Sequence, residues 1–306
     1  MKIIVLGGFG FIGKSVMTEL QSRKYSPVAL SRRNGFDLLD YENARKKLEE
    51  VKPDIVINCS AHVGGVHYVY QYASDVFHDN MQMVLNIYKM VTEVCPGARV
   101  INPIANCSYP GTANIHIESE WWDGPVHDSV LAFGNTRRMM YVVSKCYERQ
   151  HNISSVNFLV PGCVGAGDYT DPNITHALAG MIIRMLQAQK EGKREFEVWG
   201  TGKPTREWVY VGDVAQMMCN AIDFKESQIE PVNFAQNRAY SIKETAEMIK
   251  ELIGFDGKLV FNTSYQDGAP TKRLDNELFR RKYPDFVFTD LKIAVKEAID
   301  YYKAVL

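Results

Sequence analysis

Three glycines near the N-terminus constrain the fold of this chain more than any other feature. Gly7, Gly10 and Gly13 follow the apolar run KIIVL and open the amphipathic stretch GKSVMTELQSR, so a glycine-rich loop separates a predicted strand from a predicted helix. The first glycine of such a loop permits a tight turn, the second lets the backbone approach a pyrophosphate, and the third packs the helix against the strand. The pattern predicts a dinucleotide-binding unit, with phosphates at the helix N-terminus. The alternative is a glycine-rich turn without a ligand.

The first half of the chain alternates short apolar runs with amphipathic stretches. Strands are predicted at 2–8, 26–33, 54–60, 98–106 and 155–165. Helices are predicted between them at 13–23, 41–51, 75–94 and 137–152. Because the strands are apolar and β-branched and alternate with helices, we expect an α/β fold, a Rossmann-type doubly wound parallel sheet.

The pattern of predicted elements changes after about residue 165, where short strands and helices follow one another without a regular alternation. We therefore expect a dinucleotide-binding Rossmann domain over 1–165. A smaller C-terminal mixed α/β substrate domain is expected over 166–306, interleaved so that part of it returns to the first sheet.

Composition narrows the function classes. The formal net charge is -1, which favours neither nucleic acid nor an anionic membrane surface as a partner. The longest apolar runs are too short to span a bilayer, and the N-terminus turns glycine-rich too early for a signal peptide. The six cysteines show no C-x-x-C spacing, so neither a disulfide framework nor a zinc or other metal site is expected. A reducing cytoplasm is the natural location.

The end of the second predicted strand bears on the choice of dinucleotide. NAD-binding proteins usually carry an acidic residue there for the ribose hydroxyls, whereas this chain has Ser31, Arg32 and Arg33. Two guanidinium groups suit a 2′-phosphate, which predicts NADP(H) as the cofactor. The alternative is a solvated pair of surface arginines.

Further segments carry a family resemblance. They are FDLLD at 36–40, AHVGGV at 61–66, DNMQMVLNI at 79–87, CSYP at 107–110, ESEWWDG at 118–124, YERQ at 147–150, VWGTGKPTREWVYVGDVA at 198–215 and DGAPTKRLD at 267–275. With the glycine loop, they make the chain resemble the extended short-chain dehydrogenases/reductases of the NAD-dependent epimerase/dehydratase family. Within that family it is most similar to the GDP-L-fucose synthases, NADPH-dependent 3,5-epimerases and 4-reductases of GDP-4-keto-6-deoxymannose.

The resemblance implies two sets of binding residues. Those expected at the cofactor are Gly7, Gly10, Phe11, Ile12, Gly13, Arg32, Arg33, Leu39, Ser60, Ala61 and Arg137. Those expected to hold the GDP moiety of a keto sugar are Arg184, Trp199, Arg206 and Lys272. Their chemistry fits, because cations suit a diphosphate and an indole suits stacking.

The sequence departs from the family at its catalytic triad. The serine position is Ala105, with Asn106 as a possible substitute beside it, and the tyrosine and lysine positions are Phe133 and Arg137. A Tyr-x-x-x-Lys pair, Tyr141 and Lys145, follows eight residues later, about 12 Å along a helix, and is not expected to be catalytic. Phenylalanine cannot donate a proton and alanine cannot hydrogen-bond, so reduction would need an unusual donor.

Two other family positions are retained, and they suggest proton chemistry. Cys107 and His176 match the cysteine and histidine that move protons at carbons 3 and 5 of the sugar in the family. A thiol and an imidazole suit that task, since both titrate near neutrality.

The leading hypothesis is therefore NADPH-dependent reduction at carbon 4 of a GDP-4-keto-6-deoxy hexose or heptose, with or without 3,5-epimerisation, for capsule or O-antigen polysaccharide. Two alternatives stay open: an epimerase without net redox that uses Cys107 and His176, or a catalytically silent protein that binds NADP or a nucleotide sugar. The resemblance also implies a homodimer joined through a four-helix bundle, built from the helices around 76–94 and 134–150.

Overall fold

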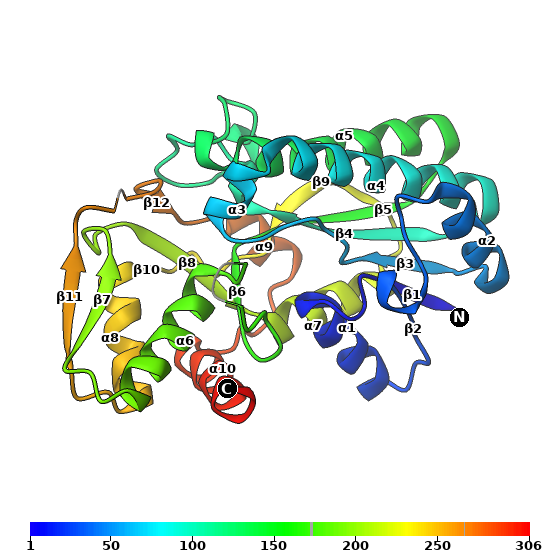
Figure 1. Cartoon of the computed structure of the whole chain (residues 1–306). Coiled ribbons are helices and arrows are strands. Elements are labelled where there is room, and N and C mark those ends of the chain that lie inside the picture. The colour runs from blue at the N-terminus through cyan, green and yellow to red at the C-terminus, as the bar shows by residue number, and fades with distance from the viewer. Residues whose placement is uncertain (172–173, 266) are drawn as a thin grey trace.

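A six-stranded parallel sheet forms the centre of the larger lobe of the molecule (Figure 1). This computed structural model describes residues 1–171, 174–265 and 267–306. The strand order is β2-β1-β3-β4-β5-β9, and every neighbouring pair is parallel. The strands are β1 (Ile3–Leu6), β2 (Val28–Leu30), β3 (Ile55–Asn58), β4 (Arg99–Ala105), β5 (Ser155–Val160) and β9 (Gln228–Asn233).

Helices cover both faces of this sheet because its strands are apolar on both sides. Ile4 and Leu6 of β1 pack into a core with one layer of helices, whereas Ile3 and Val5 point to the opposite layer. The first layer holds α2 (Tyr41–Val51), α4 (Ala73–Val94) and α5 (Leu131–His151), and the second holds α1 (Phe11–Ser22) and α7 (Val211–Asn220). The predicted fold class, a doubly wound parallel α/β sheet, is confirmed.

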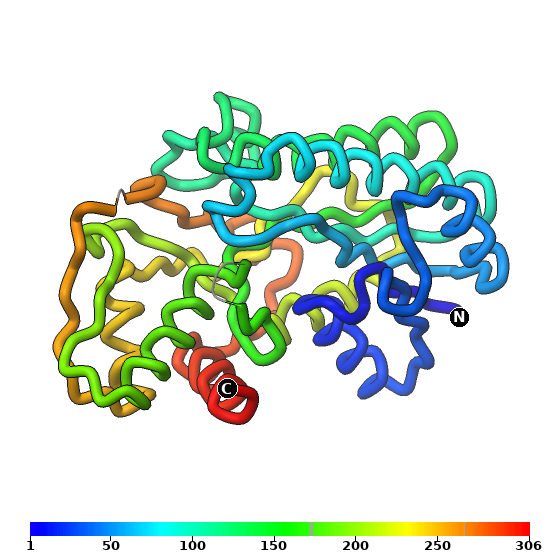
Figure 2. The backbone as a smooth tube through the Cα atoms, viewed as in Figure 1, coloured from blue at the N-terminus to red at the C-terminus, as the bar shows by residue number. Residues whose placement is uncertain are grey.

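A smaller lobe has its own core and lies beside the large one, as the chain trace in Figure 2 shows. One of its sheets runs β10-β8-β12, with β6 paired to β8, and a second consists of β7 and β11. Its strands are β6 (Gly162–Val164), β7 (Glu195–Trp199), β8 (Thr205–Tyr210), β10 (Ala239–Ser241), β11 (Lys258–Asn262) and β12 (Thr271–Lys272). The helices packed against them are α6 (Ala177–Lys190), α8 (Ile242–Ile253) and α10 (Leu291–Val305).

Short helices complete the connections between these elements. They are α3 (Val66–Gln71), α9 (Glu277–Lys282) and the 3₁₀ turns η1 (Arg32–Asn34), η2 (Asn106–Ser108), η3 (Glu118–Glu120), η4 (Asp128–Val130) and η5 (Ala221–Asp223). The chain crosses between the lobes more than once, because β9 pairs with β5 although it follows β8 of the small lobe.

Some predicted elements differ in their limits. The strand expected over 155–165 is two strands, because Pro161 has no N–H to continue the ladder, and the residues after it pair with β8 instead. The strand expected over 26–33 ends at Leu30, because the Ser31 side chain accepts a hydrogen bond from the Arg33 N–H and starts a 3₁₀ turn. Helix α5 begins at Leu131, six residues before the expected start at 137.

Candidate active site

A cleft of about 700 Å³ opens at the carboxyl ends of the parallel strands. Its walls come from the loops that follow β1, β2, β3, β4 and β5, which is where open α/β sheets bind their ligands. Arg32 and Arg33 of the large lobe and Lys272 of the small lobe line the same cleft. One continuous space therefore joins the predicted dinucleotide site to the second lobe.

The glycine loop shows why these positions exclude side chains. Gly7 has φ +71°, the left-handed region that favours glycine. A Cβ atom on Gly13 would lie 2.2 Å from the carbonyl oxygen of Gly7, so only glycine lets α1 approach β1 this closely. Helix α1 begins at Phe11 without a side-chain cap, which leaves its first N–H groups without intrahelical partners. These groups can bind phosphate.

The arginine pair lies where the 2′-phosphate of NADP(H) was expected. Arg32 and Arg33 follow β2 directly in the turn that Ser31 caps, and both line the cleft. Neither guanidinium has a hydrogen bond or ion pair to any residue that the structure describes. Two unpaired cations at this place fit an anionic ligand group.

The remaining expected cofactor residues also gather here. Of that set, the cleft is lined by Gly7, Gly10, Phe11, Ile12, Arg32, Arg33, Leu39, Ser60, Ala61 and Arg137. Gly13 lies behind them, where it packs α1 against the loop.

Two residue pairs on α5 could have been catalytic, and only one of them lies at the cleft. Phe133 and Arg137 line the cleft, as does Ala105 at the end of β4. Tyr141 and Lys145 do not line it: the Lys145 ammonium donates to the Tyr141 hydroxyl oxygen (2.7 Å), and both side chains donate to the Glu230 carboxylate. The Tyr-x-x-x-Lys pair thus links α5 to β9.

Arg137 is a buried cation at the side of the cleft. One of its Nη atoms donates to Asn80 Oδ1, its guanidinium lies 4.7 Å from the centre of the Phe133 ring, and its Nε has no partner in the described part of the chain. Burial lowers the pKa of Arg137 to about 10, so the side chain stays charged at neutral pH.

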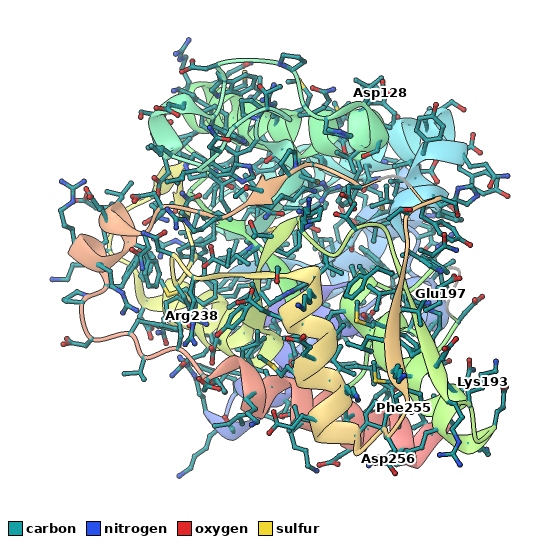
Figure 3. All side chains as sticks on the ribbon, turned by 90° about the vertical axis from the view of Figure 1, so that its left-hand side faces the viewer. Asp128, Lys193, Glu197, Arg238, Phe255 and Asp256 are labelled. Carbon is teal, nitrogen blue, oxygen red and sulfur yellow. The ribbon has the colours of Figure 1, made fainter. Side chains whose placement is uncertain are left out.

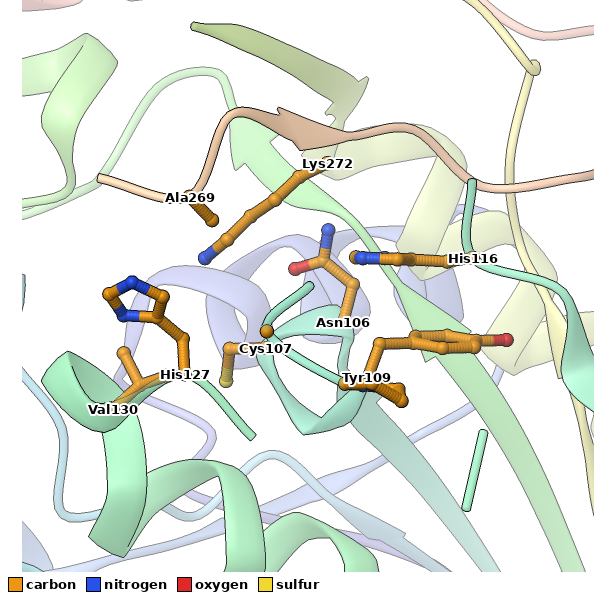
Figure 4. A pocket seen from close by; sticks show the side chains of 10 residues that line it. Asn106, Cys107, Tyr109, His116, His127, Val130, Ala269 and Lys272 are labelled. Carbon is orange, nitrogen blue, oxygen red and sulfur yellow. The ribbon is translucent and has the colours of Figure 1, made fainter. Parts of the chain in front are cut away.

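Cys107 lies in η2 and lines both the cleft and a small adjoining recess, whose residues Figure 4 shows. The recess is lined by Asn106, Cys107, Tyr109, Pro110, Gly111, His116, His127, Val130, Ala269 and Lys272. Burial raises the pKa of the Cys107 thiol, and the positive charges of Lys272 and Arg137 oppose that shift. The thiol is therefore protonated at neutral pH in the free protein.

His176 stands immediately before α6 and also lines the cleft. Its Nδ1 lies 2.9 Å from a carboxylate oxygen of Asp168, which is itself buried. Burial disfavours the charged imidazolium, yet the hydrogen bond and the charge of Asp168 outweigh it and raise the pKa of His176. The pair can hold a proton for a reacting group.

The four residues expected to hold GDP form two groups. The Arg184 guanidinium lies 4.1 Å from the Trp199 ring, and Trp199 stacks on Tyr265 at 4.9 Å between centroids. Arg184 also donates to the carbonyl of Glu197, a residue that Figure 3 labels. Arg206 and Lys272 are register partners on β8 and β12, and of the four only Lys272 lines the cleft.

Three residues of the site were not singled out in the sequence. Asp168 precedes His176 by eight residues, and an acid this close to a candidate histidine was the available signal. His116 stacks on Tyr109 with the ring centroids 4.3 Å apart, and His127 Nδ1 lies 2.8 Å from Ser129 Oγ. No sequence motif marks these two histidines.

Two absences apply to the described residues. They contain no group of three or more His, Cys, Asp or Glu side chains placed to hold a metal ion. None of the helices formed by residues 1–171, 174–265 and 267–306 is long and apolar enough to cross a membrane.

The fold and the cleft define a dinucleotide-binding Rossmann-type protein with a second lobe over the carboxyl edge of its sheet. A family model matches residues 3–235, and the chain belongs to the NAD dependent epimerase/dehydratase family. The resemblance noted from the sequence is thereby confirmed.

Individual relatives agree with this assignment. The chain is 28% identical over 276 residues to "Probable GDP-L-fucose synthase 1" of Oryza sativa subsp. japonica, covering 90% of this chain and 84% of the relative. It is 26% identical over 304 residues to "GDP-L-fucose synthase" of Dictyostelium discoideum, covering 98% and 94%. The crystal structure of a GDP-L-fucose synthetase from Naegleria fowleri bound to NADP superposes with a TM-score of 0.90 at 27% identity, covering 99% and 92%.

Proposed function

We propose that this protein is an NADPH-dependent enzyme that reduces carbon 4 of a GDP-4-keto-6-deoxy hexose or heptose, with or without epimerisation at carbons 3 and 5. The observation that carries the proposal is the single cleft that joins the glycine loop and the arginine pair to Cys107, His176 and Lys272. Reduction requires cofactor and sugar to meet in one space, and relatives with GDP-sugar synthase names cover nearly the same length.

The large lobe suits NADP(H). The N–H groups at the start of α1 would hold the pyrophosphate, Arg32 and Arg33 the 2′-phosphate, and Arg137 the nicotinamide ribose. The solved relative from Naegleria fowleri is bound to NADP. When bound, NADPH supplies the hydride for the sugar carbonyl.

The small lobe suits the nucleotide. The stacked pair of Trp199 and Tyr265 offers an aromatic surface for a base, with Arg184 over the indole. Arg206 supplies a cation for the diphosphate on the side of the cleft where Lys272 lies. In this arrangement residues 1–165 bind chiefly the cofactor and residues 166–306 chiefly the GDP-sugar.

Cys107 and His176 supply the proton chemistry for epimerisation. The Asp168-bound imidazolium of His176 can give a proton to the sugar, and the Cys107 thiol, once ionised, can take one from a carbon beside the keto group. If only these two residues act, the protein is an epimerase without net redox.

One incubation distinguishes these activities. The protein is mixed with NADPH and GDP-4-keto-6-deoxymannose in deuterated water, while absorbance follows NADPH and NMR follows deuterium at carbons 3 and 5. NADPH oxidation supports the reductase, and deuterium uptake without oxidation supports the epimerase alone. If neither occurs, titration with NADPH and GDP-sugars identifies a catalytically silent binding protein.

The Cys107→Ser variant is the matched test of the epimerase step. We expect it to abolish deuterium uptake at carbons 3 and 5, because the serine hydroxyl does not ionise near neutral pH. Uptake at the wild-type rate would exclude Cys107 as the base. Cys146→Ser, at a cysteine that does not line the cleft, serves as the control.

The assembly and setting are part of the same proposal. We propose a homodimer formed through α4 and α5, which lie side by side on the outer face of the large lobe (Figure 1). We also propose a cytoplasmic location and a role in capsule or O-antigen polysaccharide, since the reduced GDP-sugar product is a glycosyl donor.

A further inference from the structure

Reduction of a keto sugar leaves an alkoxide that needs a proton. Among the residues of the described cleft, no tyrosine near Cys107 has a hydroxyl free to donate that proton. Tyr109 lines the recess, but its hydroxyl donates to Asn233 Oδ1 at 2.8 Å. Tyr169 and Tyr301 line the wider cleft, from the loop after β6 and from α10, and neither lines the recess. The donor at this place must therefore be another group.

The two histidines of the recess differ from Lys272 in their contacts. His116 is buried against Tyr109, and burial together with the charges of Lys272 and Arg206 lowers the pKa of His116 to about 3. It is neutral at physiological pH. His127 has its Nδ1 within hydrogen-bond distance of the Ser129 hydroxyl and lies on the far side of Lys272 from Asn106 (Figure 4).

Lys272 differs from its neighbours because its ammonium group has no partner. It lines both the recess and the wider cleft, and its side chain reaches from β12 toward the space between Asn106 and His127, beside Cys107 (Figure 4). Within the part of the chain that the structure describes, its Nζ makes no hydrogen bond and no ion pair. A half-buried cation without a partner is available to a ligand in the cleft.

The surroundings of Lys272 also shift its pKa. Burial lowers the pKa of the Lys272 ammonium, and the charge of Arg206 on the neighbouring strand adds to this shift. The negative charge of Cys107 in its ionised form opposes it. A lysine shifted in this direction releases its proton more readily than an ordinary exposed lysine does.

We propose that Lys272 is the catalytic acid of this enzyme, donating a proton to oxygen 4 of the sugar in place of the missing tyrosine hydroxyl. This inference rests on the proposed reduction at carbon 4. It gives Lys272 a role at the sugar carbonyl instead of at the diphosphate.

The step balances with NADPH as the reductant. NADPH gives a hydride to carbon 4 and is oxidised to NADP⁺. The π electron pair of the carbonyl moves to oxygen 4, the Nζ–H bond of Lys272 breaks, and a new O–H bond forms. Lys272 is left as a neutral amine, which regains its proton from water.

The experiment compares wild-type protein, Lys272→Met and Lys272→Arg by NADPH oxidation with GDP-4-keto-6-deoxymannose. We expect Lys272→Met to lose roughly 100-fold or more in kcat, the usual contribution of a general acid. Lys272→Arg keeps the charge but does not release a proton at neutral pH, so we expect it to stay at least about tenfold below wild type. Lys258→Met, on exposed β11, is the control and should match wild type.

Binding and pH supply readouts that a structural or phosphate-binding role would not produce. GDP and NADPH should bind Lys272→Met with dissociation constants within about threefold of wild type by calorimetry, since the acid acts only on the sugar oxygen. An acid must be protonated to act, so wild-type kcat should fall as pH rises through the pKa of Lys272, and Lys272→Met should lack that limb.

Several results would overturn the proposal. Full activity of Lys272→Arg would show that charge alone suffices, and a weaker affinity for GDP with unchanged kcat would make Lys272 a phosphate ligand. Unchanged kcat and affinity would leave it no role. Wild-type protein that does not oxidise NADPH at all would refute the proposed reduction itself, and the acid role with it.

Discussion

Cys107 lies beside two positive charges, so the rate at which its thiol is alkylated depends on those charges. Lys272 and Arg137 both oppose the rise in the pKa of the thiol that burial causes. The thiolate is the form that reacts with alkylating reagents, so each cation increases the fraction able to react at a given pH. The side chain thus reports on Lys272 without any substrate.

Removing the charge at residue 272 should slow alkylation of Cys107. In Lys272→Met we expect the pKa of the thiol to rise further, so that at pH 8 iodoacetamide modifies Cys107 roughly tenfold more slowly, equivalent to about one pKa unit. Mass spectrometry of the peptides checks this, with Cys146, which does not line the cleft, as the internal reference. An unchanged ratio of the two rates would show that Lys272 does not act on Cys107.

The arginine pair should determine which cofactor binds. Arg32→Ala with Arg33→Ala removes two unpaired cations from the cleft. Charge-assisted hydrogen bonds contribute roughly 1.5–3 kcal/mol, so NADPH affinity should fall at least about tenfold while NADH affinity stays the same. Fluorescence titration with both cofactors measures this, and Arg194→Ala, at an exposed arginine away from the cleft, is the control. Equal losses for NADPH and NADH would contradict a role at the 2′-phosphate.

Whole elements were predictable where one local signal sufficed. Apolar runs predicted β1, β3 and β5, because strands that are buried on both faces are apolar throughout. The glycines before α1 predicted the loop and the helix that follow β1. Element limits were less predictable, since Ser31 and Pro161 ended strands through hydrogen bonding that hydrophobicity does not encode.

The candidate site was predictable only in part, for a similar reason. The residues of the glycine loop are neighbours in sequence, whereas Lys272 meets Cys107 only because β12 pairs with β8 and the small lobe folds over the sheet. The Asp168 carboxylate contacts His176, but no sequence motif predicts the conformation that brings the two together. Contacts between distant segments were therefore found only in the structure.

Strand β8 depends on Glu207, a buried acid that joins three segments. Its carboxylate accepts backbone N–H bonds from Gln236 (2.6 Å), Asn237 (3.0 Å) and Leu274 (2.9 Å). Glu207→Ala leaves one buried and two partly buried N–H donors unpaired, at about 1–3 kcal/mol each, so the free energy of unfolding should fall by about 3 kcal/mol or more.

Urea unfolding of this variant beside Glu195→Ala provides the check on Glu207. Glu195 is exposed on β7, and its replacement should change stability by less than about 0.5 kcal/mol. Equal stability of the two variants would show that water replaces the carboxylate without loss.

At the scale of the whole molecule, the outer face of the large lobe carries apolar side chains that stay exposed or partly exposed among the described residues. Phe77, Met81 and Leu85 recur at every fourth position of α4 and so share one face of the helix, and Leu85 is 41% exposed. Met139 and Val142 are partly exposed on the adjacent α5. A second copy of the chain that packs its own α4 and α5 here would bury this stripe.

Leu85→Glu should therefore convert a dimer into a monomer. A carboxylate at the centre of an apolar interface must be desolvated without a partner, so dimer affinity should fall at least about 100-fold. Sedimentation velocity measures the change, and NADPH binding confirms that the variant is folded. Ile293→Glu, an equally drastic change at a side chain 63% exposed on α10, should leave the dimer intact. A wild-type monomer, or dissociation by both variants, would contradict an interface on α4 and α5.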